Sequence, residues 1–567
     1  MPQFGTGLGP PDPLDENPTR PPSGYDRRVP VEQPAPTLAR SDLRYGSLAS
    51  LVQEAGRLYG TDEGLVDTES GRRWSFQELA ADVRVAGKAF IAAGIQKGDR
   101  VAMWAPNTSE WVIAAFGALS AGGVLVPLNT RFKGLEAAYL LEKSRATVLM
   151  CVNGFLGNDY VAALRAAEIE LPALGRIVVL KGESPSETQS WSDFLACAEA
   201  IDDTQIETRI NELGADDLSD IIFTSGTTGR PKGAMTTHGQ ALRVFGDWDE
   251  VIGLQTGDRY LIVNPFFHTF GYKAGIVAAL LVGATIIPQP VFDVSQVLQR
   301  VADERVSVLP GPPTLFQSIL DAPNRDDYDL SSLRLCVTGA AAVPVELVRR
   351  MREELTFKTI VTGYGLTETT GVVSMCRHDD DPETISLTSG RAALDVEVRI
   401  VDDQGAEVRT GEPGEVWVRG HNVMKGYFED AERTAEAITP DGWLKTGDIA
   451  IMDERGYLRI TDRIKDMYIV GGFNAYPAEI EGVILRHPAI AQVAVVGIPD
   501  ERMGEVGCAF VVARAGAVVD GAELIAWSRE QMANYKVPRR VIEVDALPLN
   551  ASGKVLKFEL RARAAAI

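Results

Sequence analysis

One ten-residue stretch, Thr224 to Gly233, holds the residue types that bind phosphate. It combines three glycines, four hydroxyl side chains and two cations. Glycines let the backbone approach a ligand closely, hydroxyls and amides donate to phosphate oxygens, and Lys232 adds positive charge. A mobile turn is the alternative, but the apolar strand expected over Ile221 to Thr224 and the paired cations favour phosphate binding. It is not a Walker loop, because Gly233 stands where the magnesium-binding Ser or Thr would follow the lysine.

Three further motifs follow along the chain: Tyr364 to Glu368, Thr446 to Asp448 and Asn550 to Lys554. A tyrosine ring can stack on another ring, a glutamate can bind a hard cation, and an aspartate can accept two hydrogen bonds. Taken singly, these residues are more often a core aromatic, a helix-start carboxylate and a turn aspartate. Lys554, which follows a turn motif, would alone be a solvated lysine.

In this order the motifs resemble the adenylate-forming superfamily of acyl-CoA synthetases, peptide-synthetase adenylation domains and beetle luciferases. The resemblance runs from about residue 46 to the last residue. It implies an ATP-dependent enzyme that uses Mg²⁺, joins a carboxylic acid to AMP and transfers the acyl group to coenzyme A. A carboxylate is a poor electrophile, so forming a mixed anhydride with AMP makes the acyl carbon reactive.

The resemblance also implies a role for each motif. Lys554, Glu368, Thr224, Lys232 and His268 are the implied catalytic residues, and Glu368 with Thr224 would hold the metal. The implied nucleotide- and coenzyme-binding residues are Thr224, Ser225, Gly226, Thr227, Thr228, Gly229, Lys232, Gly339, Ala340, Ala341, Tyr364, Gly365, Thr367, Asp448, Arg463, Lys465, Gly471, Gly472 and Lys554.

Individual roles follow from the same resemblance. Tyr364 would stack on adenine, Thr367 would contact the α-phosphate, and Asp448 would accept hydrogen bonds from both ribose hydroxyls. Arg463 would contact the ribose or the phosphates, and Lys465 would be the pivot of an interdomain hinge. Many relatives have glycine before this arginine, whereas this chain has Asp462.

Two further roles concern the acid and the coenzyme. Lys554 would reach the reacting carboxylate, and Gly471 with Gly472 would line the tunnel for the pantetheine arm. His268, within Pro265 to Gly271, would lie at the acyl pocket, where a flat aromatic ring closes a cavity without titrating.

The identity of the acid is less sharply indicated. Gly311 to Pro313 and Gly339 are further pocket candidates. The pattern resembles actinobacterial fatty-acyl ligases, and especially ligases that activate the indane-dione propanoate fragment of degraded sterols. Medium-chain and aryl acids remain open.

Three other classes compete with an acyl-CoA synthetase. An acyl-adenylate ligase that loads a carrier protein would hold the same motifs. Luciferase-type oxidation would need a luciferin pocket, and the motifs alone do not exclude it. A non-catalytic relative is disfavoured because Lys232, Glu368, Asp448 and Lys554 are all present.

Alternating helix and strand patterns from about residue 46 to 460 predict a layered α/β fold around these motifs. Strands are expected over Val101 to Trp104 and Val124 to Leu128, on either side of a helix over Trp111 to Ala121. Alternating apolar and polar residues from Val396 to Arg419 predict a half-exposed antiparallel meander.

A second, smaller domain is expected near the C-terminus. After the charged segment 462–466, Pro477 opens a helix and Ala491 to Val496 resembles a strand. We therefore expect a large AMP-binding domain over 46–461, a hinge over 462–466 and a mobile α+β domain over 467–567. Residues 1–45 hold ten of the 31 prolines and predict a flexible extension.

Composition limits the possible partners and the compartment. The formal net charge of −22 argues against a nucleic-acid surface. Five scattered cysteines without a CxxC pair predict reduced thiols in the cytoplasm. No signal peptide is visible, and the longest apolar run, Ala274 to Ile287, predicts a buried helix and strand rather than an integral membrane segment. The expected partners are the acid, ATP, CoA and, in some relatives, a second copy in a homodimer.

Overall fold

The computed structural model describes residues 45–224, 231–339, 343–463, 466–470, 473–500, 502–532, 534–549 and 555–566. The strands in these ranges form five sheets with helices packed on them, which confirms the predicted mixed α/β class. No helix in the described ranges is long and apolar enough to cross a membrane. Residues 1–44 of the predicted extension lie outside the described part.

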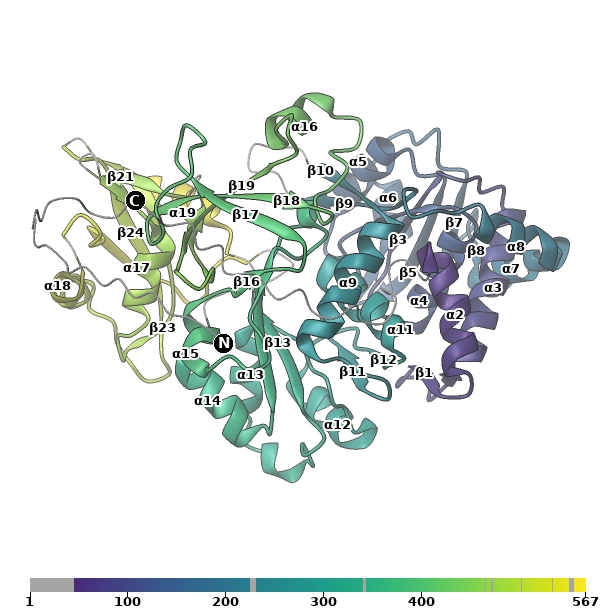
Figure 1. Ribbon diagram of the computed structural model, residues 1–567, viewed down its shortest axis with the longest axis horizontal. Helices are drawn as coiled ribbons and strands as arrows, with labels where there is room; N and C mark the ends of the chain where they lie inside the picture. Colours follow the sequence, from purple (N-terminus) through teal and green to yellow (C-terminus); the bar gives the residue numbers. More distant parts are fainter. Residues whose placement is uncertain are drawn as a thin grey trace, which may run out of the picture. The chain divides into compact units, whose positions relative to one another are not determined.

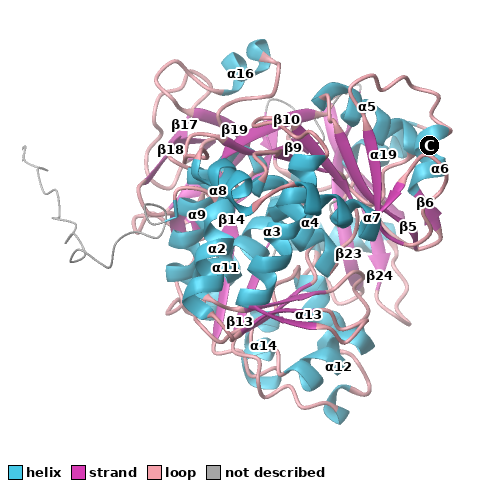
Figure 2. Ribbon diagram, turned by 90° about the vertical axis from the view of Figure 1, so that its right-hand side faces the viewer, coloured by secondary structure: helices cyan, strands magenta, loops and turns pink. Residues whose placement is uncertain are grey.

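The largest sheet is mostly parallel and has the order β10-β9-β4-β3-β5-β7-β8, with β6 paired to β5. Only β10 and β6 run antiparallel to their neighbours, and β10 lies beside β9 (Figure 2). Its strands are β3 (Arg100–Trp104), β4 (Val124–Pro127), β5 (Val148–Phe155), β6 (Asn158–Asp159), β7 (Arg176–Lys181), β8 (Gln189–Ser190), β9 (Leu218–Thr224) and β10 (Lys232–Thr237). The two strands predicted around residues 101 and 124 are confirmed as β3 and β4.

Helix α4 (Ser109–Ser120) confirms the predicted helix between these strands. Its N-cap is Thr108, whose side chain accepts a hydrogen bond from the backbone N–H of Trp111. All of its residues except Glu110 are buried, because it packs between the sheet and α3 (Phe76–Ala92). A helix that is apolar all round is stable only in such a position. Other helices of this layer are α2 (Leu48–Tyr59), α5 (Gly134–Ser144), α6 (Tyr160–Arg165), α7 (Trp191–Ala196) and α8 (Asp203–Asn211).

A second sheet, of order β11-β12-β1-β2, joins segments far apart in the chain. Its strands are β1 (Glu63–Val66), β2 (Arg73–Ser75), β11 (Arg259–Ile262) and β12 (Thr285–Pro288). Single bridges at Val308 connect β11 to a third sheet. That sheet has the order β13-β14-β15-β16, with β13 (Leu335–Gly339), β14 (Thr359–Tyr364), β15 (Ser374–Met375) and β16 (Arg391–Ala392).

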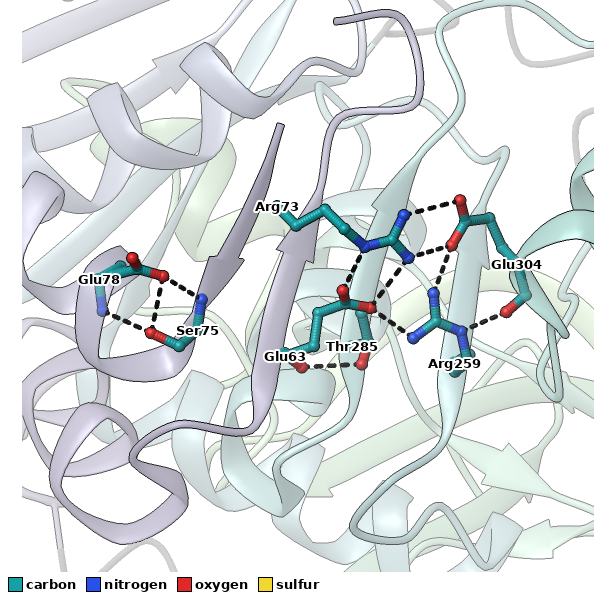
Figure 3. A network of polar contacts seen from close by, with 7 residues as sticks. All are labelled: Glu63, Arg73, Ser75, Glu78, Arg259, Thr285 and Glu304. Carbon is teal, nitrogen blue, oxygen red and sulfur yellow. Dashed lines mark hydrogen bonds and ion pairs between the residues drawn. The ribbon is translucent and has the colours of Figure 1, made fainter. Parts of the chain in front are cut away.

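Figure 3 shows the polar network that ties this second sheet together. Arg73 and Arg259 each bind the carboxylates of Glu63 and Glu304, and Glu304 ends helix α12 (Val294–Glu304). Burial alone would raise the pKa of Glu304, but the hydrogen bonds and charges of the two arginines hold that pKa below its ordinary value. The network therefore anchors the β1–β2 hairpin to a region almost 200 residues later in the chain.

The helices next to these sheets surround Pro265 to Gly271, the segment predicted to line the acyl pocket and called the acyl motif below. Helix α9 (His238–Ile252) follows β10 and ends at Gly253, which has the left-handed conformation that favours glycine. The run Ala274 to Ile287 is a buried helix leading into a strand, as predicted, but its first turns are a π-helix, Tyr272–Val277. Nothing in the residue pattern distinguishes a π turn from an α turn. The remaining helices of this part are α10 (Thr269–Gly271), α11 (Ala278–Val282), α13 (Pro313–Leu320), α14 (Val345–Glu354) and α15 (Pro382–Leu387).

The predicted meander is confirmed as a sheet of four consecutive antiparallel strands. They are β17 (Val396–Val401), β18 (Pro413–Gly420), β19 (Leu444–Met452) and β20 (Leu458–Arg463), with α16 (Ala431–Ala437) between β18 and β19. Figure 1 shows β17, β18 and β19 side by side. Val416 and Val418 point into the core of this sheet, which explains the alternation in the sequence.

The C-terminal part has its own sheet, of order β22-β21-β24-β23, with β25 paired to β24. Pro477 is the first residue of α17, as predicted, and Ile480 and Ile484 on the same helix are buried. This sheet carries two separate hydrophobic clusters. Its elements are β21 (Tyr468–Val470), β22 (Phe473–Ala475), α17 (Pro477–Ile484), β23 (Ile490–Asp500), β24 (Gly504–Ala513), α18 (Gly521–Gln531), β25 (Arg540–Glu543) and α19 (Lys557–Ala565). The expected small α+β fold is present, whereas the hinge limits remain a prediction, and residues 462–463 of that segment belong to β20.

Candidate active site

The two ends of the predicted phosphate loop lie opposite each other. Strand β9 ends at Thr224, β10 begins at Lys232, and these two residues are partners across the antiparallel pair. Asp220, on the same strand β9, is the residue through which β9 pairs with β4 of the parallel sheet. The antiparallel pair at the edge of the largest sheet therefore places Thr224 and Lys232 side by side.

Glu368 joins this point from another sheet. It lies in a 3₁₀ turn, Thr367–Thr369, that follows the end of β14 at Tyr364. The hydroxyl of Thr224 lies 3.5 Å from Oε1 of Glu368, across 144 residues of sequence. The two residues predicted to hold the metal are thus neighbours.

Glycines determine how the segment after Tyr364 folds back. A Cβ atom on Gly365 would lie only 2.0 Å from the carbonyl oxygen of Gly371. Gly371 has a φ of +103° and donates its N–H to the carbonyl of Leu366 at 2.8 Å. The resulting tight loop presents Thr367, half-buried, at the start of the turn.

A second group of predicted residues gathers around Tyr364. Its hydroxyl donates to Oδ2 of Asp448 at 2.6 Å, and Asp448 is 3% exposed on β19. Arg463 is the backbone partner of Asp448 on β20. On the other side, Gly339 is the partner of Gly363, where a Cβ on Gly339 would lie 3.2 Å from the Gly363 carbonyl oxygen. An aromatic ring beside a buried carboxylate suits a nucleoside.

His268 is exposed and begins helix α10. Its Nδ1 accepts a hydrogen bond from the backbone N–H of Phe270 at 3.2 Å. The next residue, Thr269, is buried, and its Cγ2 lies 2.5 Å from the position that a Cβ on Gly371 would take. The acyl motif therefore packs directly against the loop that follows Tyr364.

Two contacts of the segment around His268 were not found from the sequence. Asn107 is buried and holds the start of the acyl motif in place. Its side-chain amide donates to the carbonyls of Ile262 at 3.0 Å and Asn264 at 2.9 Å. Its Oδ1 accepts from the N–H of Phe266 at 2.8 Å. An asparagine in a loop carries no signal of such a long-range contact.

The other contact is an ion pair between Lys273 and Asp220, with 2.9 Å between Nζ and Oδ1 and side chains 1% and 0% exposed. Asp220 also accepts from the Ser219 hydroxyl at 2.7 Å. Burial, the largest effect, lowers the pKa of Lys273, and the charge of Asp220 opposes that change. The pair joins the strand that leads to the phosphate loop with the π-helix that follows the acyl motif. The position of Lys273 among apolar residues was the only sign in the sequence that it has a buried partner.

Several predicted residues cannot be placed by side chain. Arg463 is described through its backbone alone. Outside the described residues lie Ser225, Gly226, Thr227, Thr228, Gly229, Ala340, Ala341, Lys465, Gly471, Gly472 and Lys554.

The donor set around Glu368 fits a magnesium ion that arrives with a triphosphate. Within the described ranges no cluster of three or more His, Cys, Asp or Glu side chains is arranged to hold a metal. Mg²⁺ is commonly bound through one or two carboxylates together with substrate phosphates and water. One half-buried carboxylate with the Thr224 hydroxyl beside it meets that need.

Residues 52–428 match the family model for the AMP-binding enzyme, and residues 479–554 match that for the AMP-binding enzyme C-terminal domain. A 3-(7a-methyl-1,5-dioxo-octahydro-1H-inden-4-yl)propanoyl:CoA ligase from Rhodococcus jostii is 49% identical over 90% of this chain and 98% of its own length. The ligase of the same name from Mycobacterium tuberculosis is 50% identical over 86% of this chain and 94% of its own.

Among solved structures, the anthranilate CoA ligase AuaEII in complex with anthranoyl-AMP is similar, with a TM-score of 0.82 and 28% identity. The match covers 94% of this chain and all of that one.

Proposed function

This chain belongs to the AMP-binding enzyme family, and we propose that the acid it activates is a propanoate carrying a methylated bicyclic dione. It is an ATP-dependent, AMP-forming carboxylate–CoA ligase that uses Mg²⁺ and coenzyme A. The observation that carries the choice of acid is identity of about half over at least 86% of the chain to two ligases named for that acid. The resemblance to sterol-fragment ligases in the sequence pattern agrees with it.

The first half-reaction joins two anions, so neutralising and aligning charge is its main requirement. A carboxylate oxygen attacks the α-phosphorus of ATP, the bond from that phosphorus to the bridging oxygen breaks, and pyrophosphate leaves. Glu368 and Thr224, whose oxygens lie 3.5 Å apart, would hold Mg²⁺, which supplies positive charge to the phosphates. Lys232 would add its ammonium, and Lys554 would align the carboxylate with the α-phosphate.

The second half-reaction releases the nucleotide. The sulfur of coenzyme A attacks the acyl carbon, the bond from that carbon to the phosphate oxygen breaks, and AMP leaves while the thiol proton passes to water. Tyr364 and Asp448, joined by a hydrogen bond of 2.6 Å, would hold the adenosine through both steps. Rotation of the C-terminal domain about Lys465 would exchange Lys554 for the coenzyme tunnel at Gly471 and Gly472.

A comparison of acids tests the choice of substrate. CoA-dependent release of AMP is measured with the bicyclic dione propanoate, with octanoate and with an aryl acid. We expect kcat/KM for the bicyclic acid to exceed the others by more than about tenfold, because a pocket shaped for one acid loses binding energy with another. Equal or faster turnover of octanoate would overturn the choice of acid and leave the ligase assignment intact. Accumulation of acyl-AMP with CoA, but turnover with a carrier protein, would replace the CoA ligase by a carrier-loading enzyme.

The role of Lys554 is tested by separating the two half-reactions. Lys554→Ala should abolish adenylation of the acid, yet it should leave thioester formation from supplied acyl-AMP largely intact. Equal loss of both half-reactions would contradict the assigned role.

The compartment that we propose for the enzyme is the cytoplasm. All five cysteines are unpaired and four of them are buried, which agrees with the reduced thiols expected in the cytoplasm. A cytoplasmic enzyme would also have direct access to ATP and coenzyme A.

A further inference from the structure

We propose that Tyr427 is a positioning residue of the phosphate site, which orients the carboxylate of Glu368 through its hydroxyl and holds the ammonium of Lys232 on its ring. The inference rests on the proposed roles of Glu368 and Lys232 in binding the metal and the triphosphate. Tyr427 belongs to none of the motifs that identified the site from the sequence.

The contacts of this one side chain reach both charged groups. The hydroxyl of Tyr427 donates to Oε1 of Glu368 at 3.0 Å. The Nζ atom of Lys232 lies 4.9 Å from the centroid of the Tyr427 ring, within the range of a cation–π contact. Tyr427 is 7% exposed, so these contacts are shielded from solvent.

The backbone holds Tyr427 firmly in this place. Tyr427 forms a bridge with Ala234 on β10, and its N–H donates to the hydroxyl of Thr434 at 2.9 Å. Three residues earlier, the N–H of Met424 donates to the carbonyl of Glu368 at 2.8 Å. The segment is therefore bonded both to the strand that begins with Lys232 and to Glu368 itself.

The hydrogen bond determines which oxygen of Glu368 is available. Oε1 receives the hydroxyls of both Tyr427 and Thr224, at 3.0 and 3.5 Å. Oε2 makes no hydrogen bond or ion pair within the described part of the chain. Groups that hydrogen-bond to a metal ligand commonly fix its orientation. Because Tyr427 would fix the carboxylate of Glu368 in this way, Oε2 would face a cation without any rotation of the side chain.

The ring has a separate effect on Lys232. A lysine near a carboxylate commonly forms an ion pair with it, and each charge then cancels the other. Lys232 forms no ion pair with the described residues, and its ammonium lies over the Tyr427 ring instead. A cation–π contact leaves the positive charge intact. Both Lys232 and Glu368 thus keep their full charge for the phosphates and the metal.

Two substitutions separate the hydroxyl from the ring. Tyr427→Phe removes the bond to Glu368 and keeps the ring under Lys232, whereas Tyr427→Leu removes both. The matched control is Tyr457→Phe, because Tyr457 is 8% exposed and donates to a carboxylate oxygen of Asp380 at 2.7 Å. Binding of ATP is measured by calorimetry over a range of Mg²⁺ concentrations, and binding of AMP is measured without metal.

In Tyr427→Phe we expect the half-saturating Mg²⁺ concentration to rise by about 10- to 100-fold, the usual effect of losing the outer partner of a metal ligand. In Tyr427→Leu we expect a further loss of about three- to tenfold in the affinity for metal-free ATP, because Lys232 is no longer held. AMP affinity should stay unchanged in both variants, which also reports that the nucleoside site is folded. Tyr457→Phe should change none of these quantities.

Three results would overturn the inference. A normal Mg²⁺ dependence in Tyr427→Phe would show that the hydroxyl does not position Glu368, and an equal loss of AMP binding would show a merely structural role. Glu368→Gln distinguishes this from a failure of the proposed function. If Glu368→Gln loses its Mg²⁺ dependence while Tyr427→Phe keeps it, the function stands and the inference fails. If Glu368→Gln binds MgATP normally, the proposed role of Glu368 fails and the inference fails with it.

Discussion

Removing the ammonium of Lys273 should destabilise the protein far more than removing any surface charge. Lys273 and Asp220 lie 2.9 Å apart with side chains 1% and 0% exposed. In Lys273→Met the carboxylate of Asp220 stays buried and keeps, among the described residues, one side-chain donor, the hydroxyl of Ser219 at 2.7 Å. Breaking a buried pair in this way costs about 3–5 kcal/mol, because the remaining charge is uncompensated.

The double variant shows whether the cost comes from that stranded charge. Lys273→Met combined with Asp220→Asn removes both charges, and replacing a buried pair as a whole is close to neutral. We therefore expect the double variant to recover most of the lost stability, by about 2–4 kcal/mol relative to the single variant. Arg57→Met is the surface control, since Arg57 pairs with Glu54 at 2.7 Å with side chains 64% and 35% exposed. Its loss should leave the unfolding midpoint almost unchanged, because solvent screens an exposed pair.

The assay is urea unfolding followed by tryptophan fluorescence, with the midpoint and the slope compared across the four proteins. A cost below about 1 kcal/mol for Lys273→Met would refute the reasoning from burial. A double variant as unstable as the single one would refute the account based on the stranded carboxylate. Because the pair joins β9 to the acyl segment, we also expect the KM for the acid to rise in Lys273→Met.

Two further predictions follow from other buried groups. Complete burial, the largest cause, lowers the pKa of His238 to about 4. The unfolded chain therefore binds the proton first, and about 3 kcal/mol of stability is lost as the pH falls from about 6.5 to 4. His238→Gln should lack this loss when its unfolding is compared with that of the parent protein, and identical pH profiles would contradict it. Asp448 accepts a hydrogen bond from Tyr364, and we expect it to bind the nucleotide as well. Asp448→Asn should therefore raise the KM for ATP by about tenfold, because a hydrogen bond to a charged group is lost. The same variant should discriminate less between ATP and its 2′-deoxy analogue, and unchanged discrimination would argue against a ribose contact.

Much of the fold followed from residue periodicity. Alternation in β17 and β18, apolar runs in β3 and β9 and the proline that opens α17 each predicted the element that is present. These signals are local, because a strand or helix buries a face that the sequence itself marks. The π-helix after the acyl motif was missed, because its residues have the same apolar character as an α-helix.

The candidate site was likewise predicted only where the signal is local in the sequence. Thr224 and Lys232 were predicted from the chemistry of their loop, whereas Glu368 and Asp448 were predicted from the family resemblance. The structure brings Thr224, Lys232 and Glu368 close together. Tyr427 was missed, because an aromatic residue 59 positions after Glu368 carries no mark of its partner.

The sequence by itself therefore determined the reaction class of this protein, AMP-forming ligation, and supplied the candidate groups for it: a glycine and hydroxyl loop for phosphate, a carboxylate for a cation and a carboxylate for a diol. Tertiary structure alone decided which groups support them. The pairing of Tyr427 with Glu368 depends on how the segment around Met424 adds to β10, and the pairing of Lys273 with Asp220 depends on how the π-helix packs on β9. Such contacts are set by strand order, register and packing, and these properties belong to distant segments jointly rather than to either one alone.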